Sequence, residues 1–247
     1  MRERRDRRPS WKTRLAGGAA ALMLVACGGG GGDPGQSVFG DGGASSGGST
    51  AEPSQGHITL AAEKVDLDWF ANIDTTKLTF TAADAHGYPA GVGRIVRFRT
   101  EAGTVAPQCT LALSAGKGSS QCSVEFTTAY AGPVGSFVTV MAWVDGEEAY
   151  EDANGNGRYD TGERFWDAGR PFLDVNENGQ FDLPGDVDIL YSSSPLRGEG
   201  RQACAPGPAT GVDAPNIPLS IENTCDGVWG RGVIRTVIRL PVAPPTP

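Results

Sequence analysis

The stretch Ser136-Phe-Val-Thr-Val-Met-Ala-Trp-Val144 decides the fold class of this 247-residue chain. Its residues alternate with a period of two, which is typical of a β-strand. The same period recurs at residues 78–82, 96–98 and 122–126, with Gly- and Pro-containing turns between the runs. No segment sustains the apolar period of a helix. The sequence therefore predicts an all-β protein, a β-sandwich in which each sheet has one solvent-facing side. The alternating sets in the opening stretch are Val138, Val140, Ala142 and Val144 against Thr139, Met141 and Trp143.

Residues 57–145 resemble the bacterial Ig-like domains of the invasin/intimin type. The resemblance rests on the following stretches: Leu78-Thr-Phe-Thr-Ala-Ala-Asp84-Ala-His-Gly87-Tyr-Pro89-Ala-Gly91, Val96-Arg-Phe98, Gly103-Thr-Val105, Cys122-Ser-Val-Glu-Phe126 and Ser136-Phe-Val-Thr-Val140. It implies an Ig-like sandwich and a role in adhesion or surface display. The cysteines and the acidic segment after Val144 are departures from that family.

The acidic segment separates the predicted sandwich from a last strand. Residues 145–190 hold 13 acidic side chains and three arginines, a net charge of −10. We expect the alternating run 232–240 to rejoin the sandwich edge, because the intervening chain has few large apolar side chains for a core of its own. The alternative is a small accessory lobe. The expected organisation is a signal peptide at 1–26, a tether at 27–55, the sandwich at 56–145, an acidic insertion at 146–231, and a final strand with a frayed Pro-rich end at 232–247.

Two stretches of this insertion repeat each other 22 residues apart: Asp152-Ala-Asn-Gly-Asn-Gly-Arg-Tyr-Asp160 and Asp174-Val-Asn-Glu-Asn-Gly-Gln-Phe-Asp182. Each places side-chain oxygens at positions one, three and five and glycine at position six. The first continues to Glu163 at position twelve, which completes a calcium-loop pattern. Calcium takes about six to eight oxygen ligands, and the glycine permits the sharp turn that brings them together. The sequence therefore predicts two calcium sites in loops that resemble those of EF-hands but have no flanking helices.

The two loops differ at the twelfth position. In the second loop this position is Gly185, and Asp186 follows one residue late. Either the second site lacks a bidentate carboxylate or the chain shifts to bring Asp186 in, and we expect a weaker site. The alternative for both loops is that Asn, Gly and Asp only mark surface turns. The expected ligands are Asp152, Asn154, Asn156, the Arg158 carbonyl, Asp160 and Glu163 in loop one, and Asp174, Asn176, Asn178, the Gln180 carbonyl, Asp182 and Asp186 in loop two.

The N-terminus predicts export. A basic segment precedes an apolar run at residues 15–26, which is shorter than the roughly 20 residues needed to span a bilayer. The run ends Leu24-Val-Ala-Cys27, which resembles the lipobox of bacterial lipoproteins and implies a lipid anchor on Cys27. Gly28 after the cysteine favours the outer membrane by the same resemblance. The alternative is an ordinary cleaved signal. The Gly- and Ser-rich stretch that follows is expected to be a flexible tether.

Charge and cysteine content narrow the functional classes. Removal of residues 1–26 takes away seven basic and two acidic side chains, which leaves a mature net charge of −13. Nucleic-acid binding is therefore not expected. The four remaining cysteines predict disulfides in an exported chain. Pairing of neighbours is favoured, Cys109 with Cys122 and Cys204 with Cys225, over a zinc site, because the close spacing that zinc sites prefer is missing.

The expected function is that of a membrane-anchored, calcium-stabilised Ig-like lipoprotein, a non-catalytic module for adhesion, spacing or interaction with a protein or glycan ligand. The alternative is a calcium-dependent carbohydrate-binding module in which the insertion presents Trp166 or Trp229. No catalytic motif occurs, and the best-placed carboxylates are already explained as calcium ligands. His57 lies at the edge of the tether, and His86, in a turn with Gly and Pro, is expected to be solvent-exposed.

Overall fold

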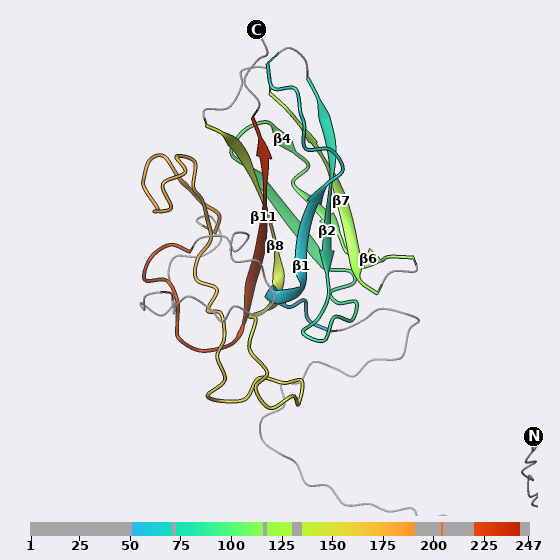
Figure 1. The fold of residues 1–247 in the computed structure, drawn as a ribbon, viewed down its shortest axis with the longest axis vertical. Coiled ribbons are helices and arrows are strands. Elements are labelled where there is room, and N and C mark those ends of the chain that lie inside the picture. Colours follow the sequence, from blue (N-terminus) through green and yellow to red (C-terminus); the bar gives the residue numbers. More distant parts are fainter. Residues whose placement is uncertain are drawn as a thin grey trace, which may run out of the picture. The chain divides into compact units, whose positions relative to one another are not determined.

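The computed structural model describes residues 51–70, 73–115, 118–129, 135–190, 204 and 220–242 (Figure 1). The predicted signal peptide, Cys27 and most of the tether lie outside these residues, as does the end of the chain from residue 243. Apart from one 3-10 turn, η1 (Gln55–His57), the regular elements described are strands, which confirms the all-β prediction. No helix in the described part of the chain is long and apolar enough to cross a bilayer.

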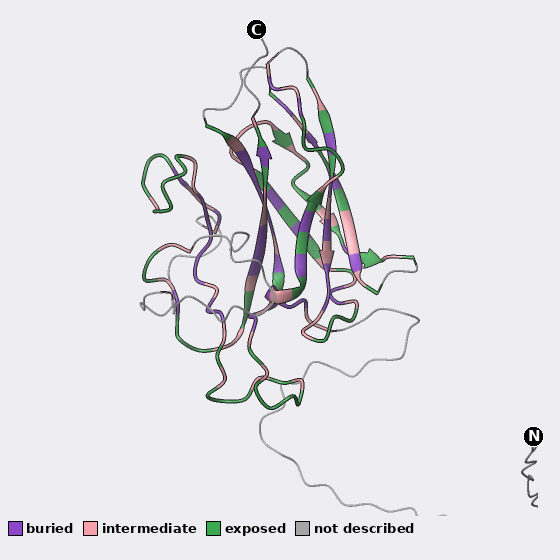
Figure 2. Ribbon diagram, in the orientation of Figure 1, coloured by how far each residue is buried: buried purple, intermediate pink, exposed green. Residues whose placement is uncertain are grey.

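The first sheet is antiparallel, with strand order β1-β2-β7-β4. The alternation that predicted strands is visible in its burial: along β2, residues facing the core alternate with residues facing away (Figure 2). A short further strand, β6, pairs with β7. The bounds are β1 (Ile58–Ala62), β2 (Thr75–Ala82), β4 (Thr104–Val105), β6 (Ala112–Leu113) and β7 (Ser120–Thr127).

The second sheet is also antiparallel, with strand order β11-β8-β3-β5. The last strand, β11, pairs with β8 over eleven positions, from Arg231 opposite Glu147 to Pro241 opposite Phe137. The chain between these two strands, residues 148–230, therefore leaves and re-enters the same sheet. The bounds are β3 (Ile95–Thr100), β5 (Gln108–Thr110), β8 (Phe137–Glu147) and β11 (Arg231–Pro241).

Both sheets contribute to one hydrophobic core. Leu78, Phe80 and Phe126 from the first sheet and Val96 and Ile234 from the second are fully buried in it. A disulfide joins Cys109 in β5 to Cys122 in β7 and so links the two sheets covalently. Burial of these apolar side chains is the main term that holds the sheets together. The arrangement is compatible with a β-sandwich.

The outer side of the second sheet is covered over β8 and β11, which corrects the expectation of one solvent-facing side, whereas Arg97 and Arg99 of β3 stay exposed. Met141 and Val237, which point away from the main core, pack with Leu173 and Ile189 of the insertion in a second apolar cluster. The small sheet of β9 (Phe172–Leu173) and β10 (Val187–Asp188) lies in this part of the insertion. Alternation alone places Met141 and Trp143 on the solvent-facing side of the sheet. Both side chains are apolar, so they can instead pack under a second layer of the protein.

The end of the predicted tether also belongs to the fold. Pro53, Ser54 and Gln55 are buried. Gln55 pairs with the outer edge of β11: its Nε2 donates to the Arg235 carbonyl (2.7 Å), and its Oε1 accepts from the Arg235 N–H (2.8 Å). Glu52 forms an ion pair with Arg94 at 2.6 Å. The predicted tether therefore ends earlier than residue 55. Its Gly/Ser-rich composition gave no sign of these hydrogen bonds and this ion pair, because they depend on a few polar side chains with specific partners.

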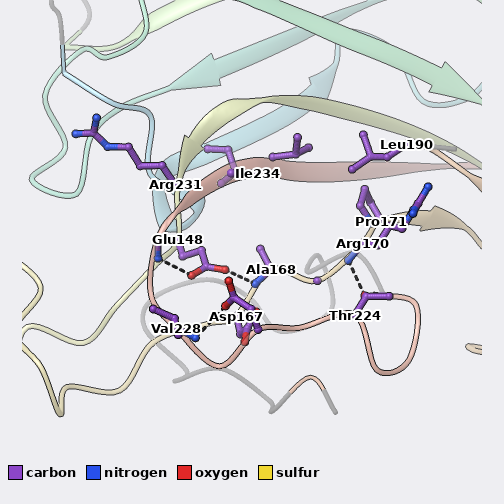
Figure 3. Close-up of a pocket in the computed structure, with 15 residues that line it drawn as sticks. Glu148, Asp167, Ala168, Arg170, Pro171, Leu190, Thr224, Val228, Arg231 and Ile234 are labelled. Carbon is purple, nitrogen blue, oxygen red and sulfur yellow. Dashed lines mark hydrogen bonds between the residues drawn. The ribbon is translucent and has the colours of Figure 1, made fainter. Parts of the chain in front are cut away.

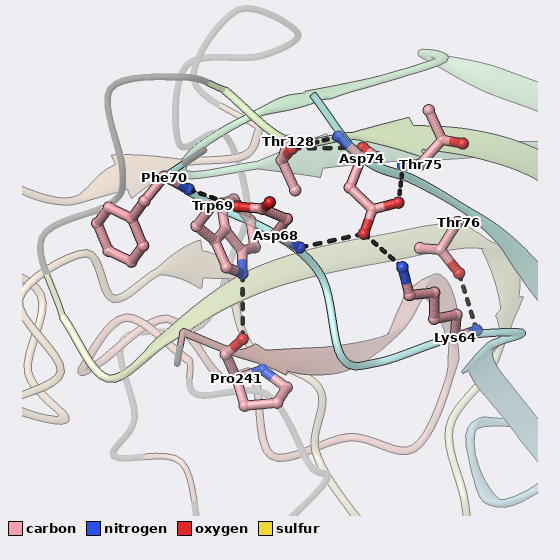
Figure 4. A network of polar contacts seen from close by, with 9 residues as sticks. All are labelled: Lys64, Asp68, Trp69, Phe70, Asp74, Thr75, Thr76, Thr128 and Pro241. Carbon is pink, nitrogen blue, oxygen red and sulfur yellow. Dashed lines mark hydrogen bonds and ion pairs between the residues drawn. The ribbon is translucent and has the colours of Figure 1, made fainter. Parts of the chain in front are cut away.

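A polar network closes the connection between β1 and β2 (Figure 4). Asp74 accepts hydrogen bonds from Lys64 Nζ and from the main-chain N–H groups of Asp68 (3.1 Å) and Thr75 (2.8 Å). The bond from Lys64, with these N–H donors, holds the pKa of Asp74 below its usual value. Beside it, the buried Trp69 donates from Nε1 to the Pro241 carbonyl at 3.1 Å and so ties this connection to the end of β11.

Candidate metal centre

The first predicted calcium loop, residues 152–163, is closed at its neck by an isolated bridge between Tyr150 and Phe165. Asp152 organises its first half. The carboxylate accepts from the N–H groups of Gly155 (2.7 Å), Asn156 (3.1 Å) and Gly157 (2.7 Å). These bonds, led by the one from Gly157, keep the pKa of Asp152 below its usual value. The side chain at position one is therefore an ionised carboxylate fixed inside the turn.

The other predicted side-chain ligands of this loop converge. Asn154 and Asn156 both donate from Nδ2 to Asp160 Oδ2 at 2.6 Å. Glu163 closes the loop, because its Oε1 accepts from the Ala153 N–H and its Oε2 from the Asp160 N–H, each at 2.9 Å. The side chains at positions three and five thus meet at one carboxylate oxygen of position nine. The carboxylate at position twelve bridges the main-chain N–H groups of positions two and nine. Arg158, the expected carbonyl ligand, donates its N–H to Asn156 Oδ1 at 2.9 Å.

The second loop repeats most of these hydrogen bonds in its first half. Asp174 accepts from the N–H groups of Asn178 (3.1 Å) and Gly179 (2.7 Å). Asn178 donates from Nδ2 to Asp182 Oδ2 at 2.6 Å and accepts from the Gln180 N–H at 2.7 Å. The Asn176 side chain accepts from the Asn178 N–H at 3.1 Å.

Asp186 occupies the place that Glu163 has in loop one. Its Oδ1 accepts from the Val175 N–H (2.9 Å) and its Oδ2 from the Asp182 N–H (2.8 Å), which are the counterparts of Ala153 and Asp160. Of the two alternatives left by the sequence, the structure therefore has the shifted chain. The carboxylate is one methylene shorter than that of Glu163 and arrives one residue later. Unlike Asn176, Asn178 and Asp182, which are exposed, Asp186 is buried.

The oxygen atoms that could ligate a metal in both loops belong to carboxylates, side-chain amides and the main chain, which is the set of ligands that calcium prefers. Among the described residues, no three Asp, Glu, His or Cys side chains form a group that could hold a metal ion. A calcium ion in either loop would be held by the amide oxygens of the Asn residues and by main-chain carbonyls as well as by carboxylates.

An aromatic side chain anchors each loop to the rest of the insertion. Tyr159 of loop one stacks on Trp229, with ring centroids 4.7 Å apart, and meets Phe165 edge-on. Phe181 of loop two packs edge-on against Phe172 at 5.4 Å. Both aromatics follow the expected carbonyl ligand directly, where the EF-hand resemblance implies an inward-packing side chain.

Each loop also touches the sandwich. His86, in the turn after β2, lies against Gly157 of loop one, so closely that a Cβ on this glycine would fall 2.2 Å from His86 Nε2. His57, His86 and Asp152 line a small cavity of about 100 Å³. The sequence predicted that His86 is exposed, and both histidines are, but it had no signal for this contact, which pairs residues about 70 positions apart.

Loop two meets the sandwich through acidic side chains. Ser136 donates to Glu177 Oε2 at 3.1 Å. Glu101 in the turn after β3 accepts from the Thr139 N–H, and its other oxygen is buried without a hydrogen-bond partner among the described residues. Burial raises the pKa of Glu101 to about 7, and the charges of Glu177 and Asp174 add to the effect. The contact is therefore electrostatically unfavourable without a proton or a counter-charge.

A separate cavity of about 310 Å³ lies between the insertion and the start of β11 (Figure 3). Glu148 at its wall accepts from the N–H groups of Ala168 (2.7 Å) and Gly230 (3.0 Å), and Asp167 accepts from that of Gly227 (2.6 Å). Burial raises the pKa of Glu148 to about 7 and also raises that of Asp167. Because main-chain donors occupy both Glu148 oxygens, these carboxylates hold the ends of the insertion together.

Arg235 fastens the insertion to β11. The side chain is fully buried and donates from its guanidinium to the Gly169 carbonyl (2.6 Å) and to Ser220 Oγ (2.5 Å). Its guanidinium carbon lies 5.6 Å from the ring centroid of Trp166, a cation–π arrangement. Burial lowers the pKa of Arg235 to about 9. Trp166 is itself buried, whereas Trp229, the other tryptophan of the carbohydrate-binding alternative, is partly exposed.

A second disulfide joins Cys204 to Cys225, so both cysteine pairs favoured by the sequence are present. Gly169 lies directly against this disulfide, where a Cβ would fall 2.6 Å from both sulfur atoms. The fold and the loops together define the class: an all-β protein of two packed antiparallel sheets with an acidic, disulfide-linked double-loop insertion. Comparison with protein-family models, curated proteins and solved structures finds no match for this chain.

Proposed function

We propose that this protein is an exported lipoprotein whose double-loop insertion binds two calcium ions and is ordered by them. The observation that carries this proposal is the repeated hydrogen-bond pattern of the two loops, in which Glu163 and Asp186 make corresponding bonds although they stand at different loop positions. Two unrelated surface turns would not be expected to be closed by a carboxylate with the same pair of main-chain hydrogen bonds. Loops of this kind in extracellular modules bind calcium at about 10⁻⁴–10⁻³ M.

The sandwich is proposed to be Ig-like. Its sheets have the orders β1-β2-β7-β4 and β11-β8-β3-β5. If β1, β2, β3, β4, β7, β8 and β11 are taken as strands A to G, these orders become A-B-E-D and G-F-C, with β5 as an additional strand beyond C. A-B-E-D and G-F-C are the two sheets of the immunoglobulin constant-type arrangement. The calcium loops then lie in the connection between strands F and G. This correspondence supports the resemblance to invasin/intimin-type domains.

Export and anchoring are proposed from the N-terminal residues and from the cysteines. Two disulfides are typical of compartments outside the cytosol. A lipid on Cys27 and the Gly/Ser-rich residues after it would hold the sandwich on a flexible tether at the outer membrane. In that setting a rigid, acidic module serves adhesion, spacing or protein interaction without catalysis. Calcium would relieve the repulsion among the carboxylates of residues 145–190.

Isothermal titration calorimetry of the full chain with calcium tests the proposal. The wild type should bind two calcium ions, and Glu163→Gln should weaken one of the two sites by at least tenfold, because it removes half of a bidentate carboxylate. Glu222→Gln, an exposed residue outside both loops, makes the same change of charge and should leave both sites unaltered. Absence of calcium heat in the wild type would refute the proposed calcium sites, and equal effects of the two variants would refute the assigned role of Glu163.

A further inference from the structure

Asn-Gly dipeptides are concentrated in the two loops. The sequence contains three, Asn154-Gly155, Asn156-Gly157 and Asn178-Gly179, and all three lie at ligand positions of the predicted calcium loops. An Asn side chain followed by glycine is chemically labile. The glycine main-chain nitrogen loses its proton and attacks Asn Cγ, the bond from Cγ to the side-chain nitrogen breaks, and ammonia leaves. Water then opens the five-membered imide to Asp or to isoAsp.

The loop geometry opposes this reaction at all three sites. The attacking nitrogens are the N–H groups of Gly155, Gly157 and Gly179, and each donates to the first Asp of its loop at 2.7 Å. Loss of that proton would place a negative nitrogen against a carboxylate, which is electrostatically unfavourable. The acceptors are Asp152 in loop one and Asp174 in loop two.

The electrophile is held as well. Each of the three Asn side chains turns its carbonyl oxygen to the N–H two residues ahead, at 3.0 Å for Asn154, 2.9 Å for Asn156 and 2.7 Å for Asn178. The Cγ atom is therefore held away from an approach by the glycine nitrogen. All three side chains are exposed, so water is already present, and opening of the loop is the step that remains.

We propose that Asn154, Asn156 and Asn178 are deamidation sites that the closed loops protect through these glycine-to-aspartate hydrogen bonds. Each loop then accumulates a covalent mark in proportion to the time it spends open. The Asp product places a fourth carboxylate among the loop's predicted oxygen ligands, beside the three that each loop already has. The isoAsp product lengthens the main chain by one atom and removes the register on which the closing carboxylate depends.

The calcium dependence of the reaction rests on the proposed function. If deamidation proceeds only from the open loop, its rate follows the open fraction. Calcium at ten times its dissociation constant lowers that fraction about elevenfold, because it binds only the closed loop. Chelation should therefore speed the reaction by the same factor at all three sites.

Peptide mass spectrometry of the full chain after incubation at mildly alkaline pH tests the proposal. Samples are kept in calcium, in chelator and in urea. Deamidation at the three sites should be slowest in calcium and fastest in urea, and equal rates in calcium and urea would overturn the proposal. Equal but slow rates in calcium and chelator would leave protection by the fold standing and would refute calcium binding instead.

The variant Asp174→Ala isolates the hydrogen bond. In chelator, where calcium ligation plays no part, it removes the acceptor for Gly179 and should accelerate deamidation at Asn178. Asn154 and Asn156 in the same molecules are the internal control and should react at the wild-type rate, whereas global unfolding would accelerate all three. An unchanged rate at Asn178 would overturn the assigned protection.

Discussion

At the scale of single residues, the two glycines of loop one at positions four and six have almost the same φ angle but different surroundings. Gly155 has φ +73° and open space around it, whereas Gly157 has φ +75° and faces the His86 ring. Gly155→Ala should therefore cost only the left-handed conformation, about 1–2 kcal/mol of unfolding free energy. Gly157→Ala should cost more, because the histidine must also move.

The double variant His86→Ala with Gly157→Ala separates these two contributions. Removal of the ring should return the cost of Gly157→Ala to that of Gly155→Ala in urea unfolding at a fixed calcium concentration. Equal costs of the two single glycine variants would mean that His86 does not hold loop one against the sandwich.

Glu148 predicts a pH dependence of stability. Its pKa is about 7 in the folded protein and 4.5 in an unfolded chain, because burial disfavours the charged form. The folded state therefore binds the proton more tightly than the unfolded state. The stability that protonation of Glu148 contributes is fully present below pH 4.5 and is lost as pH rises to about 7. In Glu148→Gln this contribution is absent. The stability of the wild type relative to the variant should fall over this range in urea unfolding, and a constant difference would contradict the assigned burial.

At the scale of elements, β11 is an edge strand of eleven residues, and such edges need protection from pairing with other chains. Gln55 provides it by occupying the N–H and C=O groups of Arg235. Gln55→Ala should lower the unfolding free energy by about 1–3 kcal/mol, because it leaves two buried main-chain groups unpaired. Urea unfolding measures this, with the exposed Gln108→Ala on β5 as the control, and similar small effects of both variants would argue against edge protection by Gln55.

The sequence predicted the strands better than it predicted which faces of the strands are covered by other parts of the chain. Alternation located β2, β3, β7, β8 and β11 because each has one face in the main core. It assigned Met141 to a solvent-facing side because period two cannot tell water from a second apolar layer. The packing of residues 51–55 was missed since it depends on specific hydrogen bonds to β11 and β8 and not on apolar content. In the candidate site, the repeat located both loops, but the role of Asp186 required the path of the chain.

At the scale of the whole molecule, the sandwich and the insertion are joined at several separate points. The outer cluster around Met141 and Leu173 is apolar, whereas Arg235 provides buried hydrogen bonds and stacks on Trp166. The loops themselves touch the sandwich at His86 and Ser136. Any free energy that calcium adds to the loops is therefore transmitted to β8 and β11, between which the insertion is placed.

Arg235→Met should weaken this coupling. It leaves the Gly169 carbonyl and Ser220 without their donor and removes the charge that faces Glu148, so a loss of about 3 kcal/mol is expected. In hydrogen-exchange mass spectrometry of the wild type, chelation of calcium should speed exchange in residues 148–190 and also in β8 and β11. In the variant, the insertion should already exchange rapidly in calcium, and chelation should no longer change the exchange rates of β8 and β11. Arg239→Met, on the same strand but exposed, should behave as the wild type. If chelation affects the strands equally in both variants, Arg235 does not carry the coupling, and the apolar cluster around Met141 is the remaining connection.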